Sequence, residues 1–332
     1  MRCYLGTSLD SLDAYSLVDL PEPQPGPGEV RLRVQAAALG FVDGLLALGR
    51  YQVRPPVPYV PGGEIAGVVE ALGEGVESIA PGDRVVAWRL GGGMAEQVVV
   101  PVGDLLPIDA EMDAAVAASI LVDYQTSQYA LVDIGRIRAD DTVLVLGAAG
   151  GVGSAAVQMA ARAGARVIAA ASSGPKRDLA MSLGAHAAID SSRADWRDEL
   201  KRIVPGGLVD LVFDPLGGDF TEAAFRSLAK EGRHLVVGFA AGRIPSLPVN
   251  LALLKNAALL GVDFRHFRNA HPQHAEHNRR GVYRMVTQGY LKPPALVRFP
   301  LEQARDALAA TMTRARLGKV VIEPCPKSAG RL

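Results

Sequence analysis

The stretch Val143-Leu144-Val145-Leu146-Gly147-Ala148-Ala149-Gly150-Gly151-Val152-Gly153 carries the strongest structural signal in the chain. Its four leading apolar residues predict a buried strand, and the pattern of residues 154–163 after it predicts a helix. A glycine-rich turn between a strand and a helix is typical of dinucleotide-binding units, because the diphosphate of the ligand meets free N–H groups at the helix N-terminus.

Each glycine of this turn is needed for its own physical reason. A side chain at Gly150 or Gly151 would hold the backbone away from a diphosphate, and Gly153 lets the helix pack closely on the strand. We therefore predict that the four residues from Gly150 to Gly153, including Val152, bind a dinucleotide. Ala148 stands where the usual fingerprint has its first glycine, so a slightly different turn is expected. The alternative is a tight turn without a ligand.

Strand-like and helix-length segments alternate on both sides of this turn. The predicted strands are Thr142–Leu146, Arg166–Ala170, Ala187–Ile189, Leu208–Phe213, His234–Val237 and Ala258–Leu260. Gly164 and Gly184 are placed to end helices, since glycine readily adopts the left-handed conformation there. The alternation predicts a doubly wound parallel sheet over residues 122–262.

The flanking segments have a different pattern. Val30, Leu32 and Val34 alternate with polar residues, and further short strands separated by glycine and proline turns follow up to residue 121. Such spacing predicts a β barrel or sandwich. Residues 263–332 are short for a domain of their own. We therefore expect them to complete the first domain, which would consist of residues 1–121 and 263–332.

The composition narrows the class of protein. The chain has 332 residues, 49% of them hydrophobic, and equal numbers of acidic and basic side chains. The hydrophobic content argues against a disordered chain. The equal numbers of charges argue against a nucleic-acid or anionic membrane surface, which would normally show an excess of basic residues. Two cysteines, Cys3 and Cys325, provide no disulfide framework or four-cysteine metal site. Without an 18-residue apolar run or a signal peptide, the expectation is a cytoplasmic protein with no membrane span.

The end of the second predicted strand indicates which dinucleotide is bound. An NAD site has Asp or Glu at this place to accept the ribose 2′-hydroxyl, whereas this chain has Ser172, Ser173, Lys176 and Arg177. Hydroxyl groups and cations suit a 2′-phosphate. The prediction is therefore NADPH rather than NADH. The alternative is a polar loop with two solvated cations.

Four stretches resemble the zinc-independent quinone oxidoreductase branch of the medium-chain dehydrogenase/reductase superfamily. They are residues 40–64, which include Gly40-Phe41-Val42-Asp43, Gly49-Arg50-Tyr51 and Pro58–Glu64, then Gly147–Gly153, Asp214–Gly218 and Gly318–Val321. The resemblance implies a GroES-like β domain, a Rossmann domain, a cofactor cleft between them, and a homodimer formed through the Rossmann domains.

The chain also departs from its relatives. Zinc-dependent members have a Cys near Val42 and Asp43 and a His where this chain has Gly63, so we expect no metal site. Many quinone reductases have Asn in place of Gly40 and Tyr in place of Ser191. The first change implies the loss of a polar contact near the nicotinamide. The second implies a different adenosine-phosphate pocket.

The resemblance and the missing metal ligands together suggest the chemistry. Without a Lewis acid, the favoured acceptors are those that delocalise the incoming electrons, such as a quinone or a similar conjugated carbonyl. Phe41 and Tyr51 are the candidate substrate contacts. In similar enoyl-thioester reductases the Tyr of this motif is a proton donor, so an enoyl-thioester or 2-alkenal reductase using Tyr51 remains an alternative. Tyr51 could instead only pack the cleft. An NADPH-binding sensor or scaffold without useful turnover is the alternative of another class.

The remaining candidates each have a structural alternative. Asp43 orients polar groups in the cleft or caps a loop. Lys319 reaches the cofactor or is a solvated lysine, and Asp214 contacts a ligand or caps the next helix. Three further positions fit cofactor contacts or plain packing: Thr126, Gly238 and Phe239. His271, His274 and His277 are spaced by three without an obvious further ligand, so a solvated helix beginning at Pro272 is expected rather than a metal site.

Overall fold

The computed structural model describes residues 1–313 and 316–324. The chain folds into two compact units, one formed by Met1–Val122 with the chain from Pro293 onward, the other by Asp123–Lys292. We call them unit 1 and unit 2. The C-terminal residues that carry Cys325 lie outside the described part.

Unit 1 is built mainly from strands. Its strands are β1 (Arg2–Gly6), β2 (Tyr15–Asp19), β3 (Glu29–Leu39), β4 (Glu64–Leu72), β5 (Arg84–Trp88), β6 (Gln97–Pro101), β7 (Leu105–Pro107), β14 (Leu296–Pro300) and β15 (Lys319–Glu323). Its α-helices are α1 (Phe41–Ala47), α2 (Ala114–Ser119) and α11 (Ala304–Thr311).

Unit 2 alternates strands with helices. Its strands are β8 (Thr142–Leu146), β9 (Arg166–Ala171), β10 (Ala187–Asp190), β11 (Val209–Asp214), β12 (Leu228–Val236) and β13 (Ala258–Gly261). Its α-helices are α3 (Asp123–Gln128), α4 (Gly151–Arg162), α5 (Gly174–Ser182), α6 (Trp196–Ile203), α7 (Asp219–Phe225), α8 (Asn250–Lys255), α9 (Phe264–Ala270) and α10 (Pro272–Thr287), and a π-helical turn spans Tyr129–Ile134.

The sheet of unit 2 is the predicted doubly wound parallel sheet. Its strand order is β10-β9-β8-β11-β12-β13, and every pair in it is parallel. The order reverses between β8 and β11, and ligands of such folds bind at the carboxyl ends of the strands beside this point. Val143, Leu144, Val145 and Leu146 are all fully buried, as expected where helices cover both faces of a parallel sheet.

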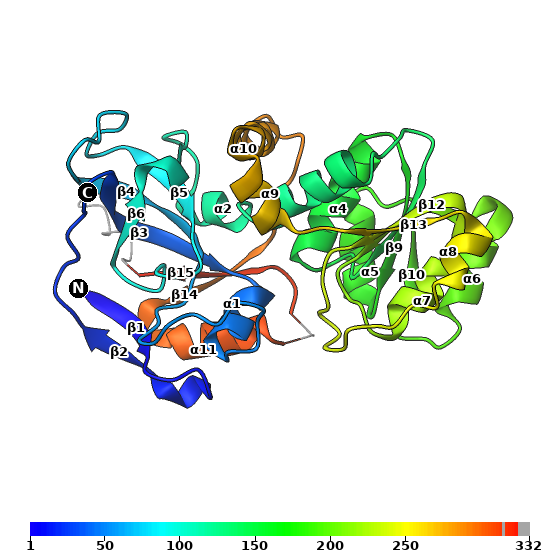
Figure 1. Ribbon diagram of the computed structural model, residues 1–332, viewed down its shortest axis with the longest axis horizontal. Helices are drawn as coiled ribbons and strands as arrows, with labels where there is room; N and C mark the ends of the chain where they lie inside the picture. Colours follow the sequence, from blue (N-terminus) through cyan, green and yellow to red (C-terminus); the bar gives the residue numbers. More distant parts are fainter. Residues whose placement is uncertain (314–315, 325–332) are drawn as a thin grey trace. The chain divides into compact units, whose positions relative to one another are not determined.

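The main sheet of unit 1 joins strands from both ends of the chain. Its order is β14-β15-β3-β4-β5-β7, with β6 also paired to β3. β15, red in Figure 1, lies antiparallel beside the blue β3, with Val320 opposite Leu39. The C-terminal strands therefore complete a sheet that the N-terminal part begins.

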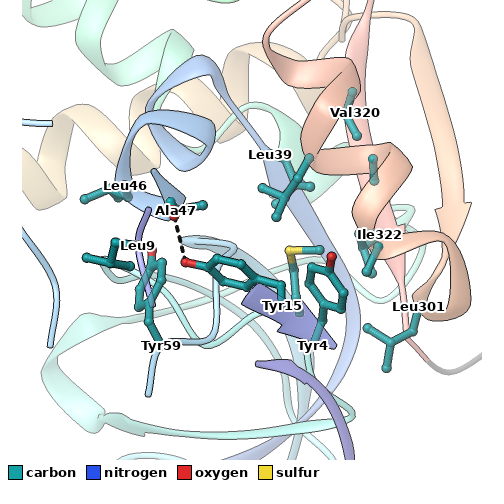
Figure 2. Packing of buried hydrophobic residues seen from close by; sticks show 14 residues of the cluster. Tyr4, Leu9, Tyr15, Leu39, Leu46, Ala47, Tyr59, Leu301, Val320 and Ile322 are labelled. Carbon is teal, nitrogen blue, oxygen red and sulfur yellow. Dashed lines mark hydrogen bonds between the residues drawn. The ribbon is translucent and has the colours of Figure 1, made fainter. Parts of the chain in front are cut away.

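An apolar cluster with three buried tyrosines forms one core of unit 1 (Figure 2). The rings of Tyr4 and Tyr15 stack with centroids 5.7 Å apart. The Tyr15 hydroxyl donates to the carbonyl oxygen of Ala47 at 2.9 Å, and the Tyr59 hydroxyl donates to that of Leu90 at 2.6 Å. Hydrogen bonding lets these hydroxyls be buried at low cost.

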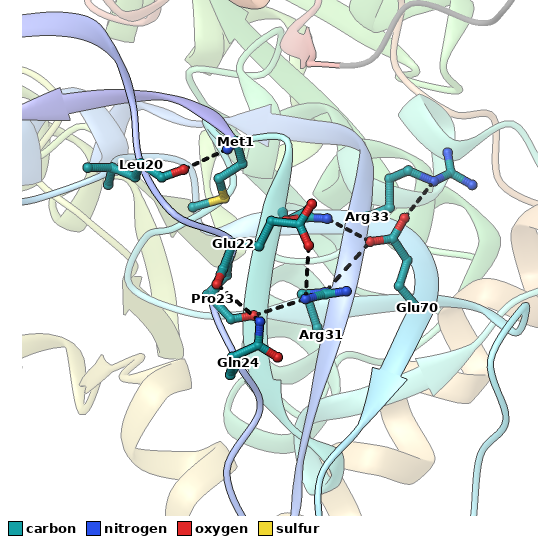
Figure 3. A network of polar contacts seen from close by, with 9 residues as sticks. Met1, Leu20, Glu22, Pro23, Gln24, Arg31, Arg33 and Glu70 are labelled. Atoms are coloured by element: carbon teal, nitrogen blue, oxygen red, sulfur yellow. Dashed lines mark hydrogen bonds and ion pairs between the residues drawn. The ribbon is translucent and has the colours of Figure 1, made fainter.

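A polar network fastens the proline-rich segment before β3 to the sheet (Figure 3). Arg31 forms an ion pair with Glu22 at 3.3 Å and donates to the carbonyl oxygen of Pro23 at 3.4 Å. Glu70 of β4 lies between Arg31 and Arg33, 3.1 Å from the Arg33 Nε. The segment therefore leads into β3 along a defined path.

Residues 263–292 group with unit 2, whereas the sequence analysis placed them with the β-rich domain. The Tyr129 ring stacks on Phe267 of α9 with centroids 4.1 Å apart, and the Asn278 amide of α10 donates to Asp133 at 3.1 Å. These contacts hold α9 and α10 on the π-helical turn. The return to unit 1 comes at Pro293 instead of residue 263.

Among residues 1–313 and 316–324, no helix is both long enough and apolar enough to cross a membrane.

Candidate dinucleotide-binding site

The turn from β8 to α4 has the geometry that its glycines predict. Gly147 adopts a φ of 59°, and its carbonyl oxygen accepts the N–H of Gly150 at 2.9 Å. A Cβ on Gly153 would lie 2.2 Å from that same carbonyl oxygen, so the helix packs directly on the turn. Gly147 therefore supplies the tight bend that the usual fingerprint assigns to the position of Ala148.

The N-terminus of α4 has no cap from its own N-cap residue. That residue is Gly150, which has no side chain to accept an amide hydrogen. Free N–H groups and the positive end of the helix dipole favour an anion at such a place. The predicted residues Gly150, Gly151, Val152 and Gly153 thus fit the diphosphate of a dinucleotide.

α3 lies against the start of α4. The Ser127 hydroxyl is within hydrogen-bonding distance of two carbonyl oxygens, 2.8 Å from that of Val152 and 2.9 Å from that of Asp123. Thr126 is the buried neighbour of Ser127 on the same helix. Thr126 therefore lies on a helix, α3, that contacts the predicted diphosphate loop.

Asp123, which the sequence analysis did not single out, also lies at this loop. A Cβ on Gly151 would lie 2.1 Å from the Asp123 Oδ2, so the carboxylate fills the space next to that glycine. No motif marks an acid at this position, because it approaches the loop from another helix.

The turn from β9 to α5 carries the residues predicted to bind a 2′-phosphate. Ser173 is the N-cap of α5, Ser172 is exposed, and Lys176 lies half-buried in the first helical turn. Arg177 is directed to a neighbouring strand, where its Nη1 is 3.0 Å from Asp190 Oδ2 at the end of β10. The structure thus sets Arg177 apart from the other three.

The charged form of Asp190, which pairs with Arg177, is stabilised by its neighbours. The hydroxyl and amide of Ser192, followed by the charge of Arg177, lower the pKa of the Asp190 carboxyl. Ser191, at the position where relatives carry Tyr, is buried and donates its N–H to the carbonyl oxygen of Ala171 at 3.2 Å.

Asp214, at the end of β11, organises the loop that follows it. Its Oδ1 accepts the N–H groups of Leu216 and Gly217, both at 2.9 Å. Its Oδ2 accepts the Thr221 hydroxyl at 2.7 Å and lies 3.0 Å from the Nε2 of His234. Both donated amides belong to the loop before α7, whose N-cap is Gly218, so Asp214 orders this loop rather than capping the helix itself.

The charge of Asp214 is stabilised in its buried position. Burial alone would raise the pKa of this carboxyl, but the hydrogen bonds from His234, Gly217 and Thr221 outweigh burial and lower the pKa. The loop therefore keeps its shape at neutral pH.

Gly238 and Phe239 follow β12 and lie next to this loop. The N–H of Gly238 donates to the carbonyl oxygen of Asp214 at 3.3 Å. A Cβ on Gly217 would lie 2.7 Å from the Phe239 ring, which shows how closely the two loops pack. The unit 2 residues predicted to bind the cofactor thus lie in the turns after β8, β9 and β12, in the first turns of α4 and α5, and on α3.

The other predicted residues belong to unit 1. Asp43 caps α1: its Oδ2 accepts the N–H of Gly40 at 2.7 Å and its Oδ1 accepts the N–H of Gly63 at 3.0 Å. This geometry fits the loop-capping alternative. Phe41 is the first residue of α1. Tyr51 is half-buried against the apolar cluster of Figure 2.

Lys319 is buried in an ion pair. Its Nζ lies 2.6 Å from Glu64 Oε1, and the side chains of both residues are less than 5% exposed. The Oε2 of Glu64 accepts the N–H of Val122 at 2.8 Å. This is not the solvated lysine that the sequence analysis kept as an alternative. The ion pair joins residues 255 positions apart in the sequence, so no local pattern of residues predicts the role of Glu64.

The positions linked to metal binding carry other interactions. A Cβ on Gly63, where zinc-dependent relatives have His, would lie 2.2 Å from the carbonyl oxygen of Arg89. His274 Nε2 is 3.1 Å from Asp133 Oδ1, and His271 and His277 lie on the exposed side of the same segment. No group of three or more potential ligands occurs within residues 1–313 and 316–324.

Two domain families match the chain. Residues 26–110 match the alcohol dehydrogenase GroES-like domain, and residues 151–277 match the family described as zinc-binding dehydrogenase. The first match lies within unit 1 and the second within unit 2.

Individual relatives match over most of the chain. Quinone oxidoreductase-like protein 2 of Rattus norvegicus is 36% identical over 302 residues, which are 90% of this chain and 86% of the rat protein. The quinone oxidoreductase of Thermus thermophilus, solved also with NADPH, is 34% identical with a TM-score of 0.83, covering 97% of this chain and all of the other. The CurK enoyl reductase is 26% identical with a TM-score of 0.87, covering 97% of this chain and 99% of its own.

Proposed function

The chain belongs to the quinone oxidoreductase branch of the medium-chain dehydrogenase/reductase superfamily, and from this we propose that it transfers a hydride from NADPH to a quinone or similar conjugated carbonyl without a metal ion. The observation that carries the proposal is the turn Gly147–Gly153, whose N-cap residue Gly150 provides no side-chain cap to the first amides of α4. Bound NADPH supplies the hydride.

The preference for NADPH rests on the β9–α5 turn. The turn that follows β9 has no carboxylate of its own, and its Ser172, Ser173 and Lys176 offer hydroxyls and a cation to a 2′-phosphate. Arg177, held by Asp190, supports this turn. The similar Thermus thermophilus quinone oxidoreductase, solved in complex with NADPH, agrees with this assignment.

Reduction of a conjugated acceptor requires little acid–base catalysis from the protein. A quinone spreads the incoming charge over a ring and two oxygens, so the main tasks are to position the acceptor and to exclude water. Phe41 and Tyr51 are the substrate contacts in this proposal. Asp43 keeps α1, which carries Phe41, in place.

Reduction of an enoyl thioester or a 2-alkenal is the second candidate. The similarity to the CurK enoyl reductase favours it, and Tyr51 would then donate the proton to carbon. The acceptor, rather than the fold, separates the two candidates.

The decisive experiment measures steady-state oxidation of NADPH and NADH with quinones, 2-alkenals, enoyl thioesters and simple aldehydes. The expected result is fastest turnover with NADPH and a quinone. Faster turnover of enoyl thioesters would favour the second candidate. NADPH binding without turnover of any acceptor would instead favour a sensor or scaffold.

The variant Tyr51→Phe separates the two enzymatic candidates by mechanism. It removes only the hydroxyl, so the packing against the apolar cluster is kept. Quinone turnover should stay within a few-fold of wild type, whereas a proton-donor role would make turnover fall by about 10²-fold or more. Tyr290→Phe, on the exposed surface of unit 2, serves as the matched control.

We also propose that unit 2 mediates a homodimer. β13 is an edge strand, and large apolar side chains on and before it are exposed, with Val249 at 84%, Leu253 at 82% and Leu254 at 70%. Soluble proteins rarely leave such a patch and such an edge uncovered.

A further inference from the structure

The carboxylate of Asp123 lies at the N-terminus of α4, where the proposed cofactor places its diphosphate. Asp123 is the first residue of α3 and Gly151 the first residue of α4. An added Cβ on Gly151 would lie 2.1 Å from Asp123 Oδ2, 2.6 Å from Cγ and 2.9 Å from Oδ1. The whole carboxylate therefore lies against this glycine.

The backbone that carries Asp123 is held firmly. The Ser127 hydroxyl contacts the carbonyl oxygens of Asp123 and Val152, which ties α3 to α4. The Tyr124 hydroxyl donates to the carbonyl oxygen of Lys292 at 2.5 Å, and the side-chain oxygen of Gln158 on α4 accepts the N–H of Lys292 at 2.8 Å. These contacts hold the backbone of α3, and with it the Cα of Asp123, against α4.

An acid at this place opposes a bound dinucleotide. The amide groups at the start of α4 attract the diphosphate, whereas the carboxylate repels it, and such charge effects are strong in a partly desolvated site. The diphosphate is common to NADPH and NADH. The repulsion must therefore act on both alike, unlike the contacts of the β9–α5 turn, which concern the 2′-phosphate only.

We propose that Asp123 limits the affinity of unit 2 for nicotinamide dinucleotides. This inference rests on the proposed function, because it needs a dinucleotide at the Gly147–Gly153 turn. It adds a residue that sets how tightly the cofactor is held without setting which cofactor is chosen.

The test is the variant Asp123→Asn, with dissociation constants measured by calorimetry. Asparagine keeps the shape of the side chain and one oxygen acceptor, and it removes the charge. Binding of NADPH and of NADH should each tighten by about tenfold or more, so their ratio should stay the same. The gain should shrink at high salt, since salt screens the repulsion.

The matched control is Asp140→Asn. Asp140 is exposed and lies just before β8, at the amino end of the strand and so at the opposite edge of the sheet from the loop. It makes the same change in net charge far from the diphosphate. Neither dissociation constant should change, and thermal melting should show that all three proteins are folded.

Each other outcome has a definite meaning. Wild-type affinity in Asp123→Asn would mean that the carboxylate only supports α4, and weaker binding would mean that it contacts the ligand directly; both overturn the inference and leave the proposed function standing. If folded wild type and Asp123→Asn bind neither dinucleotide, the proposed function fails, and the inference fails with it.

Discussion

At the scale of single residues, Lys176 is where the choice of cofactor can be tested. It belongs to the first turn of α5, beside Ser172 and Ser173. Losing a charge-assisted contact costs about 1.5–3 kcal/mol, so Lys176→Ala should weaken NADPH binding about tenfold or more and leave NADH nearly unchanged. Dissociation constants measured by fluorescence titration check this.

The control for Lys176 is another lysine of unit 2. Lys201 lies on α6 and pairs with Asp198 on the surface, so Lys201→Ala should change neither constant. An equal loss for NADPH and NADH in Lys176→Ala would contradict the assignment of this turn to the 2′-phosphate.

At the scale of elements, the β8–α4 turn should tolerate no side chain at Gly153. The added methyl of Gly153→Ala would meet the carbonyl oxygen of Gly147 at 2.2 Å, which is backbone and cannot move aside cheaply. Overpacking of this kind costs about 1–3 kcal/mol, so the thermal midpoint should fall by several degrees.

A second glycine provides the matched comparison. Gly281 lies inside α10, and beyond the backbone of its own helix no atom comes within 4 Å of an added Cβ. Gly281→Ala should therefore stabilise the protein by about 0.5–1 kcal/mol, because alanine favours the helix. Similar midpoints for the two variants would contradict the expectation that a side chain at Gly153 overpacks the turn.

The tyrosine core of unit 1 should make the fold sensitive to alkali. Burial, followed by the nearby Tyr4, raises the pKa of Tyr15 to about 12, and burial also raises that of Tyr59. An unfolded tyrosine has a pKa of about 10. Because the folded pKa is the higher one, this stabilisation is complete below pH 10 and is lost as the pH rises from about 10 to 12.

The variant Tyr15→Phe isolates this effect. It loses the hydrogen bond to Ala47, so at neutral pH it should be less stable by about 1 kcal/mol. Between pH 10 and about 12 the difference from wild type should narrow, since phenylalanine has no proton to lose. Urea unfolding at each pH measures this, and parallel curves would contradict it.

At the scale of the whole molecule, the patch around α8 and β13 should decide the oligomeric state. Replacing the exposed Leu253 and Leu254 with Glu puts two charges into the proposed interface. Sedimentation velocity should show a dimer for wild type and a monomer for this variant. Leu17→Glu, at an exposed position on β2 of unit 1, should remain dimeric. A monomeric wild type would rule the dimer out.

The amino-acid sequence by itself determined the parallel sheet and the glycine turn. Runs such as Val143–Leu146 are apolar on both faces, and Gly147–Gly153 offers the small residues that a close turn needs. Both features depend on neighbours along the chain, and such local patterns record which surfaces are buried. The open N-terminus of α4 was predictable for the same reason.

Only the tertiary structure decided which side chains face one another. Arg177 pairs with Asp190 from the next strand, Lys319 pairs with Glu64 from the other end of the chain, and Asp123 reaches Gly151 from another helix. The grouping of residues 263–292 with unit 2 likewise depends on the stacking of Tyr129 on Phe267. These contacts join residues far apart in sequence, and their distances depend on how whole elements pack, which no local pattern encodes.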